Sequence, residues 1–326
     1  MNKSDSERIA AELEKKNCKP AKDFKAADLL IINICSVREA ALNRAKTRAR
    51  QIKSLNPNAK LILTGCILES NLKEMEEIAD EIWPQADLEI EAKHKFEKSV
   101  FVPIMTGCNN FCSYCVVPYT RGREKSRNPK DIIKNIKDLT KTGYCEITLL
   151  GQNVNSYKYK PKFNELWDFP KLLKEIVKIP GNFKIHFLTS HPKDMSDELI
   201  EIIASSNKIS KDIHLPVQSG DDKILEKMNR KYNTDHYKNL VKKIRKKILN
   251  SRISTDIIVG FPGETKKQFQ NTLKLVKEIG FSQIFVAAYS PRPQTEASEL
   301  KDNISCEEKK NRREKILNLL KKQTSN

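Results

Sequence analysis

The sequence predicts an α/β fold, in which an incomplete parallel-sheet domain of the flavodoxin or Rossmann type precedes an open (β/α)6 partial TIM barrel. Strand and helix patterns alternate along most of the 326 residues, which favours parallel sheets. Six strand and helix units follow residue 94, too few for a closed eight-stranded barrel. The length allows two domains, which we place at residues 1–93 and 94–326.

The amino-terminal domain reads as an incomplete βα repeat. Each strand ends at a cysteine, Cys35 or Cys66, and ligands gather at the carboxyl ends of parallel strands, so we expect these two thiols to face a shared site. The predicted elements are a helix at Asp5 to Lys16 capped by Ser4 or Asp5, a strand at Ala27 to Ile34, a helix at Ser36 to Leu55, a strand at Leu61 to Leu63 and a helix at Leu72 to Ala79.

Six apolar strands make up the predicted barrel. They are Phe101 to Met105, Glu146 to Leu150, Lys184 to Leu188, Asp212 to Leu215, Ile253 to Val259 and Ile284 to Tyr289. The helix after the first strand has clear boundaries, because Asn128 can cap it, Pro129 suits its first position and Gly143 can end it. As in closed barrels, the chemistry should lie at the carboxyl ends of these strands.

Composition points to the cytoplasm and to a polyanionic partner. No apolar run is long enough to cross a bilayer, and eight cysteines in a reducing compartment favour metal ligands or buried thiols over disulfides. A formal charge of +18 would attract RNA, although a solubilising surface is an equal alternative. Residues 222–252 carry a net +8, and their apolar residues follow helical spacing, which predicts a basic outer helix.

A cysteine triplet follows the first barrel strand. Cys108, Cys112 and Cys115 form a C-x3-C-x2-C arrangement, and three thiolates on one loop can hold three corners of a [4Fe-4S] cluster. The fourth iron would be left open for the amino and carboxylate groups of S-adenosylmethionine (SAM). A zinc site is the less favoured alternative, because no fourth Cys or His follows within twenty residues.

This triplet, with Tyr114 before its third cysteine, resembles the signature of the radical SAM superfamily. The resemblance implies reductive cleavage of SAM and a 5'-deoxyadenosyl radical that abstracts a hydrogen from an unactivated carbon. The protein would position and shield these cofactors.

Further stretches resemble one branch of the superfamily, the methylthiotransferases, and especially their tRNA type. That family would add a methylthio group to carbon 2 of N6-isopentenyladenosine at position 37 of tRNA, next to the anticodon. The matching stretches are Asn33 to Glu39, Thr64 to Cys66, Tyr119 to Arg123, Leu150 to Tyr157, Thr189 to Pro192, His214 to Gly220, Met228 to Tyr232, Ser254 to Asp256 and Gly260 to Thr265.

The resemblance also implies roles for individual residues. Cys108, Cys112 and Cys115 would hold the radical SAM cluster, and Cys35 and Cys66 would be two of three ligands of an auxiliary [4Fe-4S] cluster. The SAM pocket would be lined by Tyr114, Gln152, Asn153, Ser190, Gln218, Ser219 and Arg230.

Several residues could have a structural role in place of a functional one. His191 and His214 fit structural hydrogen bonding better than catalysis. Arg121 and Arg123 fit surface charges and contacts with phosphate or SAM equally well. Cys145 reads as an ordinary thiol.

The sequence departs from the family pattern at three places. The family begins with a strand ending in a cysteine, and here Met1-Asn2 lies just past that point; we do not accept Cys18 as a replacement, since it follows the first helix. We therefore expect an incompletely ligated auxiliary cluster, weak sulfur transfer and a recorded start that is too late. The family's carboxyl-terminal RNA-binding barrel is replaced by a basic helix at Lys309 to Lys322, and Gln294 replaces an expected glycine.

Alternative functions stay open at this point. The methylthiolated target could be threonylcarbamoyl-adenosine in tRNA or a ribosomal protein, or the chain could be a cluster-binding protein that has lost sulfur transfer. For the leading hypothesis, the partners are tRNA and an electron donor such as flavodoxin or ferredoxin. We expect a monomer without a membrane partner.

Overall fold

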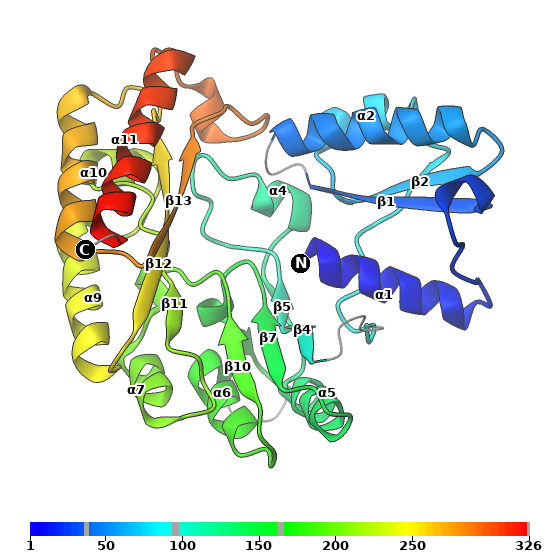
Figure 1. The fold of residues 1–326 in the computed structure, drawn as a ribbon, viewed down its shortest axis with the longest axis horizontal. Helices are drawn as coiled ribbons and strands as arrows, with labels where there is room; N and C mark the ends of the chain where they lie inside the picture. Colours follow the sequence, from blue (N-terminus) through cyan, green and yellow to red (C-terminus); the bar gives the residue numbers. More distant parts are fainter. Residues whose placement is uncertain (36–38, 93–97, 162–165, 325–326) are drawn as a thin grey trace.

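The computed structural model describes residues 1–35, 39–92, 98–161 and 166–324 and has the predicted α/β class (Figure 1). Within those ranges, no helix is both long enough and apolar enough to cross a bilayer. The predicted domain boundary at residue 93 lies outside the described residues and stays a prediction.

The amino-terminal part is a three-stranded parallel sheet in the order β1-β2-β3. Its strands are β1 (Leu29–Cys35), β2 (Lys60–Cys66) and β3 (Glu81–Ile82), and its helices are α1 (Asn2–Lys15), α2 (Glu39–Leu55) and α3 (Leu72–Glu76). Figure 1 shows α1 and α2 on opposite sides of β1 and β2. Both predicted strands form and, as expected, each closes at a cysteine, although β2 runs three residues past the predicted Leu63. Their last residues, Cys35 and Cys66, are register partners.

The predicted start of the first helix is wrong. The helix begins at Asn2, with Met1 at its cap position, so neither Ser4 nor Asp5 caps it. Both residues are buried inside the helix, and the Asp5 carboxylate forms ion pairs with Arg8 and Arg121, each at 2.6 Å. A pairing across 116 residues therefore overrides the local capping preference of an aspartate. The predicted start of the second helix, Ser36, lies outside the described residues.

All six predicted barrel strands form, and their pairings are parallel. They make two three-stranded sheets, in the orders β4-β7-β10 and β11-β12-β13. A parallel bridge between Ile185 and Ile209 links the first sheet to the segment before β11. The strands are β4 (Ser99–Pro103), β7 (Glu146–Leu150), β10 (Lys184–Phe187), β11 (Asp212–His214), β12 (Arg252–Val259) and β13 (Gln283–Ala288). The continuous open barrel stays a prediction.

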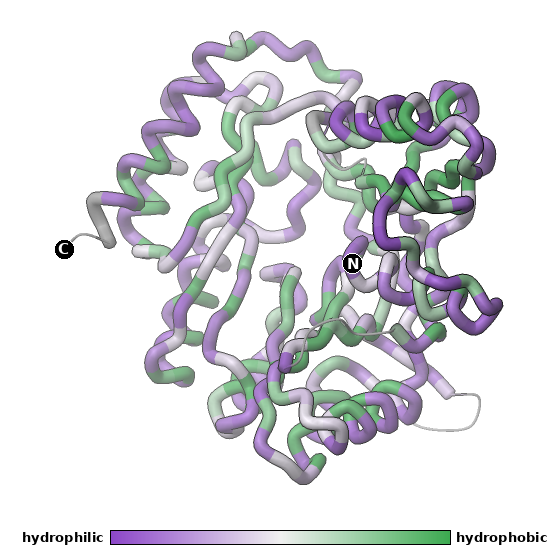
Figure 2. Tube along the Cα trace, turned by 45° about the vertical axis from the view of Figure 1, so that its right-hand side comes forward, coloured by the Kyte–Doolittle hydropathy of each residue, from purple (hydrophilic) through white to green (hydrophobic). Residues whose placement is uncertain are grey.

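Helices cover the outer faces of these strands (Figure 1). They are α5 (Pro129–Lys141), α6 (Phe169–Val177), α7 (Asp197–Ser205), α9 (Thr234–Lys247), α10 (Lys266–Ile279) and α11 (Cys306–Thr324). A further short helix, α8 (Asp222–Lys227), follows β11, and its Ile224 packs in a separate apolar cluster with Phe261 and Tyr289. Strand β12 buries every second residue, as expected for one face packed on helices. Figure 2 shows apolar residues on the strands and polar residues on the outer helices.

Local sequence signals explain several helix boundaries. The Asn128 side chain accepts a hydrogen bond from the Lys130 N–H and Pro129 takes the first position of α5, as predicted. The predicted apolar residues Tyr237, Leu240, Val241 and Ile244 of α9, and Ile248 at its C-cap, are all buried. The predicted basic outer helix is therefore confirmed.

Candidate functional site: a cysteine loop beside the carboxyl ends of parallel strands

The three predicted cluster ligands lie on one loop, between β5 (Met105–Thr106) and α4 (Val117–Arg121). The loop is tied to the end of α8. The Ser113 N–H donates to the Met228 carbonyl at 3.1 Å, its hydroxyl donates to the Lys227 carbonyl at 2.7 Å, and the Asn229 amide donates to the Phe111 carbonyl at 2.8 Å. These contacts fix the loop backbone against the motif that begins at Met228.

Gly107 is required where the cysteine loop begins. Its φ is +79°, and a Cβ atom would lie 2.1 Å from the Arg123 carbonyl oxygen. Its N–H donates to Gln152 Oε1 at 2.6 Å, so the loop after β7 also holds this turn. A side chain at this position would force the cysteine loop away from its anchors.

Burial shapes the chemistry of the cysteine thiols. It raises the pKa of Cys115 to about 12 and also raises the pKa of Cys108. Iron binds the thiolate, so loading a cluster would release these protons. No group of three or more His, Cys, Asp or Glu in the described ranges could hold one metal ion. A four-iron cluster instead distributes its thiolates over different irons, one to each.

Arg230 lies beside the cysteine loop and is buried, with 8% of its surface exposed. Its Nη1 lies 3.5 Å from Cys112 Sγ, and its Nη2 donates to the Pro216 carbonyl at 2.8 Å. Its Nε donates to the Tyr232 hydroxyl at 2.8 Å. Tyr114 is half-buried and packs against an apolar cluster that includes Met228 and Phe261. A guanidinium is thus held next to the thiols, where an anionic group could approach it.

Three of the predicted SAM-lining residues have buried polar atoms without a partner in the described structure. They are Asn153 Oδ1, Ser190 Oγ and Gln218 Oε1. Unpaired buried polar atoms are costly and rare in proteins, so they fit a site that receives a polar ligand. Ser219, also predicted, is fully buried, and its hydroxyl lies 3.5 Å from the Thr272 hydroxyl.

Arg121 connects the cysteine loop to the other predicted metal ligands. It ends α4, and its side chain is only 4% exposed. Its Nε donates to Cys66 Sγ at 3.1 Å, and its Nη2 donates to Asp5 at 2.6 Å and to Asn2 Oδ1 at 3.0 Å. Burial raises the pKa of Cys66, while the Arg121 charge opposes that shift. The guanidinium therefore favours a thiolate at Cys66.

Comparisons with known proteins agree with this arrangement. Residues 102–276 match the Radical SAM superfamily, and residues 1–83 match a family described as Uncharacterized protein family UPF0004. The chain is 42% identical to the tRNA-2-methylthio-N(6)-dimethylallyladenosine synthase of Carboxydothermus hydrogenoformans, over 98% of this chain and 80% of that protein. The corresponding synthase of Clostridium novyi is 43% identical, over 97% and 78%. The chain belongs to the methylthiotransferase family of radical SAM enzymes.

Solved structures support the fold of this methylthiotransferase family member. The radical S-adenosylmethionine methyltransferase TsrM from Kitasatospora setae superposes with a TM-score of 0.59 at 14% sequence identity. The match covers 86% of this chain and 64% of TsrM, less than two thirds of its length. At this identity the likeness shows the fold alone.

Sequence reasoning missed the role of Arg121, for which a surface charge was one alternative. That alternative is wrong, because the side chain is buried between two parts of the chain. Its position just after the cysteine loop gave a signal, but its partner Asp5 lies 116 residues away. Arg123, by contrast, stacks its guanidinium 4.1 Å from the centre of the Phe111 ring.

The two histidines make structural hydrogen bonds, as expected. His191 Nδ1 accepts from the Lys193 N–H at 3.2 Å, and burial lowers the pKa of His191 to about 2, so the ring stays neutral. His214 contacts the Ser254 hydroxyl at 2.9 Å and Asp256 at 3.3 Å. Gln294, which replaces an expected glycine, has the left-handed φ of +68° that glycine favours.

Proposed function

We propose that this chain is a radical SAM methylthiotransferase that adds a methylthio group to carbon 2 of N6-isopentenyladenosine at position 37 of tRNA. The observation that carries the proposal is the buried Arg230 guanidinium beside Cys112, on a loop with three closely spaced thiols. The chain is also more than 40% identical to two synthases of that modification. Their names give the substrate class, and the cysteine loop gives the chemistry.

The cysteines, Tyr114 and the neighbouring Arg230 each have a proposed role. Cys108, Cys112 and Cys115 would hold three irons of a [4Fe-4S] cluster. When bound, the cluster and SAM supply the one-electron chemistry that breaks a carbon–sulfur bond and activates an unreactive C–H bond. Arg230 would attract the SAM carboxylate, and Tyr114 would pack beside SAM and exclude water.

The loops after the strands would complete the SAM pocket. The unpaired atoms of Asn153, Ser190 and Gln218 can each make a hydrogen bond to a polar ligand. Gln152 would keep the cysteine loop in place through its bond to the Gly107 N–H. Ser219 would do the same for the loop after β11 through its contact with α10.

Cys35 and Cys66 are proposed ligands of the auxiliary [4Fe-4S] cluster. They end adjacent strands in register, and Arg121 points at Cys66 from the cysteine loop side. Iron analysis of the reconstituted chain tests this role. Cys35→Ala combined with Cys66→Ala should lower the iron content and abolish sulfur transfer while SAM cleavage continues.

SAM cleavage tests the primary site. Anaerobically reconstituted and reduced protein should produce 5'-deoxyadenosine, and Cys112→Ala should abolish it. Cys145→Ala is the matched control. Cys145 is half-buried and precedes β7, at the opposite end of that strand from the loop that contacts Gly107, and its thiol lies 3.7 Å from the Lys98 carbonyl. Equal cleavage by Cys112→Ala and the parent protein would refute the cluster assignment.

The product identifies the substrate. Mass spectrometry of tRNA nucleosides from a strain lacking the gene should show isopentenyladenosine without its methylthio group, and restoring the gene should restore it. Loss of methylthiolation from threonylcarbamoyl-adenosine or from a ribosomal protein would contradict the proposal. An unchanged nucleoside profile would favour a cluster-binding protein without sulfur transfer.

The remaining parts of the proposal concern the cell. The substrate tRNA and the free thiols fit the reducing cytoplasm. Reduction of the cluster requires a low-potential donor, for which we propose flavodoxin or ferredoxin. We also propose a monomer, and light scattering of the purified chain should give about 37.5 kDa.

A further inference from the structure

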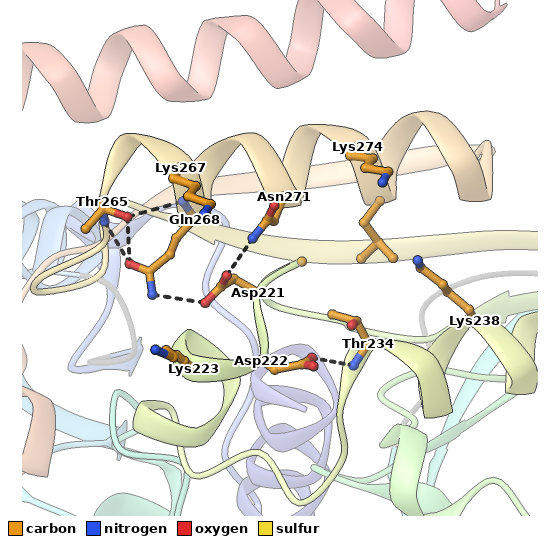
Figure 3. A pocket seen from close by; sticks show the side chains of 12 residues that line it. Asp221, Asp222, Lys223, Thr234, Lys238, Thr265, Lys267, Gln268, Asn271 and Lys274 are labelled. Atoms are coloured by element: carbon orange, nitrogen blue, oxygen red, sulfur yellow. Dashed lines mark hydrogen bonds between the residues drawn. The ribbon is translucent and has the colours of Figure 1, made fainter.

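A groove of about 620 Å³ lies between α8, the start of α9 and α10 (Figure 3). Four lysines line it and define what we call the lysine groove: Lys223 of α8, Lys238 of α9, and Lys267 and Lys274 of α10. Figure 3 shows Lys238 and Lys274 on opposite sides of the groove and Asp221 between the helices. Leu275 is the single aliphatic side chain of its described lining, so the groove suits a charged ligand.

The acidic side chains of the lysine groove already have partners. Asp221 Oδ1 accepts from the Gln268 amide at 3.0 Å and from the Ile224 N–H at 3.2 Å. Its Oδ2 accepts from the Asn271 amide at 2.7 Å. Asp222 likewise accepts from the Thr234 N–H at 2.7 Å. These neutral donors hold the two carboxylates in place without using any of the lysines.

Three of the four lysines have exposed side chains that are not in ion pairs within the described ranges: Lys223, Lys267 and Lys274. Lys238 pairs with Glu278 at 2.9 Å. The hydrogen bond from Lys238 is the largest cause of the lowered pKa of Glu278, and Lys274 contributes by its charge. Most of the positive charge therefore remains available to a ligand.

The first turn of α10 adds to this positive potential. It begins Lys266-Lys267 and contains no acidic residue, although helix starts favour acids. The start of the helix is otherwise stabilised, since Thr265 and Gln268 form a capping box. Two lysines at a positive helix end repel the helix dipole, and a bound anion would relieve that repulsion.

The lysine groove is lined in part by residues that follow the carboxyl ends of two strands, Gly220 and Asp221 after β11 and Thr265 after β12. The proposed SAM site is made of loops at the same ends of the strands. Asp221 comes two residues after Ser219. The Gly220 N–H donates to the Thr272 hydroxyl at 3.0 Å, and a Cβ on Gly220 would lie 2.5 Å from the Thr272 Cα atom. The loop that would line the SAM pocket is thus held against α10, which forms one side of the lysine groove.

The outer face of α9 carries the same residue type in a different situation. Lys243 pairs with Asp197 of α7 at 2.7 Å, and Lys247 pairs with Glu201 of α7 at 2.7 Å. These two lysines already have anionic partners within the protein. The basic outer helix that the sequence predicts within residues 222–252 is therefore partly neutralised.

We propose that the lysine groove, and not the outer face of α9, binds the sugar-phosphate backbone of the tRNA. Unpaired lysines beside the reaction edge would hold phosphates while the target base enters the site, a division of roles common in nucleic-acid recognition. This inference rests on the proposed function, and it adds which surface meets the RNA.

The test compares two variants with the same loss of charge. One is Lys223→Gln with Lys267→Gln and Lys274→Gln, and the control is the corresponding triple replacement at 243, 246 and 247. Both lower the formal charge of +18 by three, so a general electrostatic effect is equal. Binding of tRNA to the anaerobically reconstituted full chain is measured by fluorescence anisotropy over a range of salt concentrations.

The groove variant should bind more weakly, by about tenfold or more, and its plot of log affinity against log salt should be shallower by about 2 to 3, one for each lost phosphate contact. The control should keep the parent slope within about one. Circular dichroism checks the fold, and if the triple variant does not fold, the single variants Lys223→Gln, Lys267→Gln and Lys274→Gln should each lower the slope by about one.

Three results would overturn the inference. Equal weakening in the groove and control variants would show that only total charge matters, and parent-like binding by the groove variant would show that RNA lies elsewhere. In both cases methylthiolation by the parent protein would leave the proposed function standing. A parent protein that binds no tRNA would overturn the inference and the proposed function together.

Discussion

Replacing Arg312 with methionine should destabilise the chain by about 3–5 kcal/mol at neutral pH, because it leaves the Glu264 carboxylate buried without its cation. Arg312 Nη1 on α11 donates to Glu264 Oε2 at 2.8 Å, and the two side chains are 4% and 1% exposed. Only the Gly260 N–H, at 2.7 Å, would still donate to Oε2, and Oε1 has no partner in the described ranges. The unfolding midpoint should fall by about 6–10 °C.

This loss of stability should depend on pH. Burial raises the pKa of Glu264 above its ordinary 4.5, and the Gly260 N–H and Arg312 oppose that shift. A folded-state pKa above the unfolded-state value gives a stabilising contribution that is complete below the unfolded pKa and is lost as pH rises through the folded pKa. Without Arg312 the folded pKa rises further. The deficit should therefore be largest at neutral pH and shrink toward pH 4.5.

Urea unfolding followed by circular dichroism at both pH values measures the effect. Arg313→Met is the matched control, because Arg313 is exposed on the same helix and its Nε donates only to the Val286 carbonyl at 3.2 Å among the bonds described. Adding Glu264→Gln to Arg312→Met should recover about half of the lost stability at neutral pH, since no charge remains buried. A double variant no more stable than the single one would refute the reasoning.

Three other substitutions test packing and backbone geometry by calorimetry. Arg121→Met should cost about 3 kcal/mol, because buried Asp5 loses one of the two arginines it pairs with in the described ranges, and a parent-like midpoint would argue against the buried pair. Gln294→Gly should stabilise by about 0.5–1 kcal/mol, since a side chain at φ +68° costs more than glycine's extra unfolded-state entropy; a destabilised variant would contradict this. Gly220→Ala should cost about 1–3 kcal/mol, because its Cβ would meet the α10 backbone at 2.5 Å, and an unchanged stability would show that the loop can move.

Local patterns in the sequence predicted most of the secondary structure. The strands that end at Cys35 and Cys66 and the cap at Asn128 depend on residues within a few positions of one another, which is why they could be predicted. The short strand β3 was not predicted, because Glu81 and Ile82 give too little periodic signal. The cysteine loop was also readable, since its three thiols lie within eight residues.

Tertiary structure alone decided which charges meet. Aspartate is a residue type that favours helix caps, yet Asp5 lies inside α1. It does so because Arg121, beyond the cysteine loop, forms an ion pair with it. The lysines of α9 and of the lysine groove are the same residue type in the sequence, and only the packing of α9 against α7 gives Lys243 a carboxylate partner. The sequence by itself determined the elements and the cysteine chemistry, because these depend on near neighbours. Electrostatic interaction energy varies with the separation and burial of the charges. Charge pairing therefore depends on distances between helices that are far apart in the chain, and only the folded structure decides which charges pair.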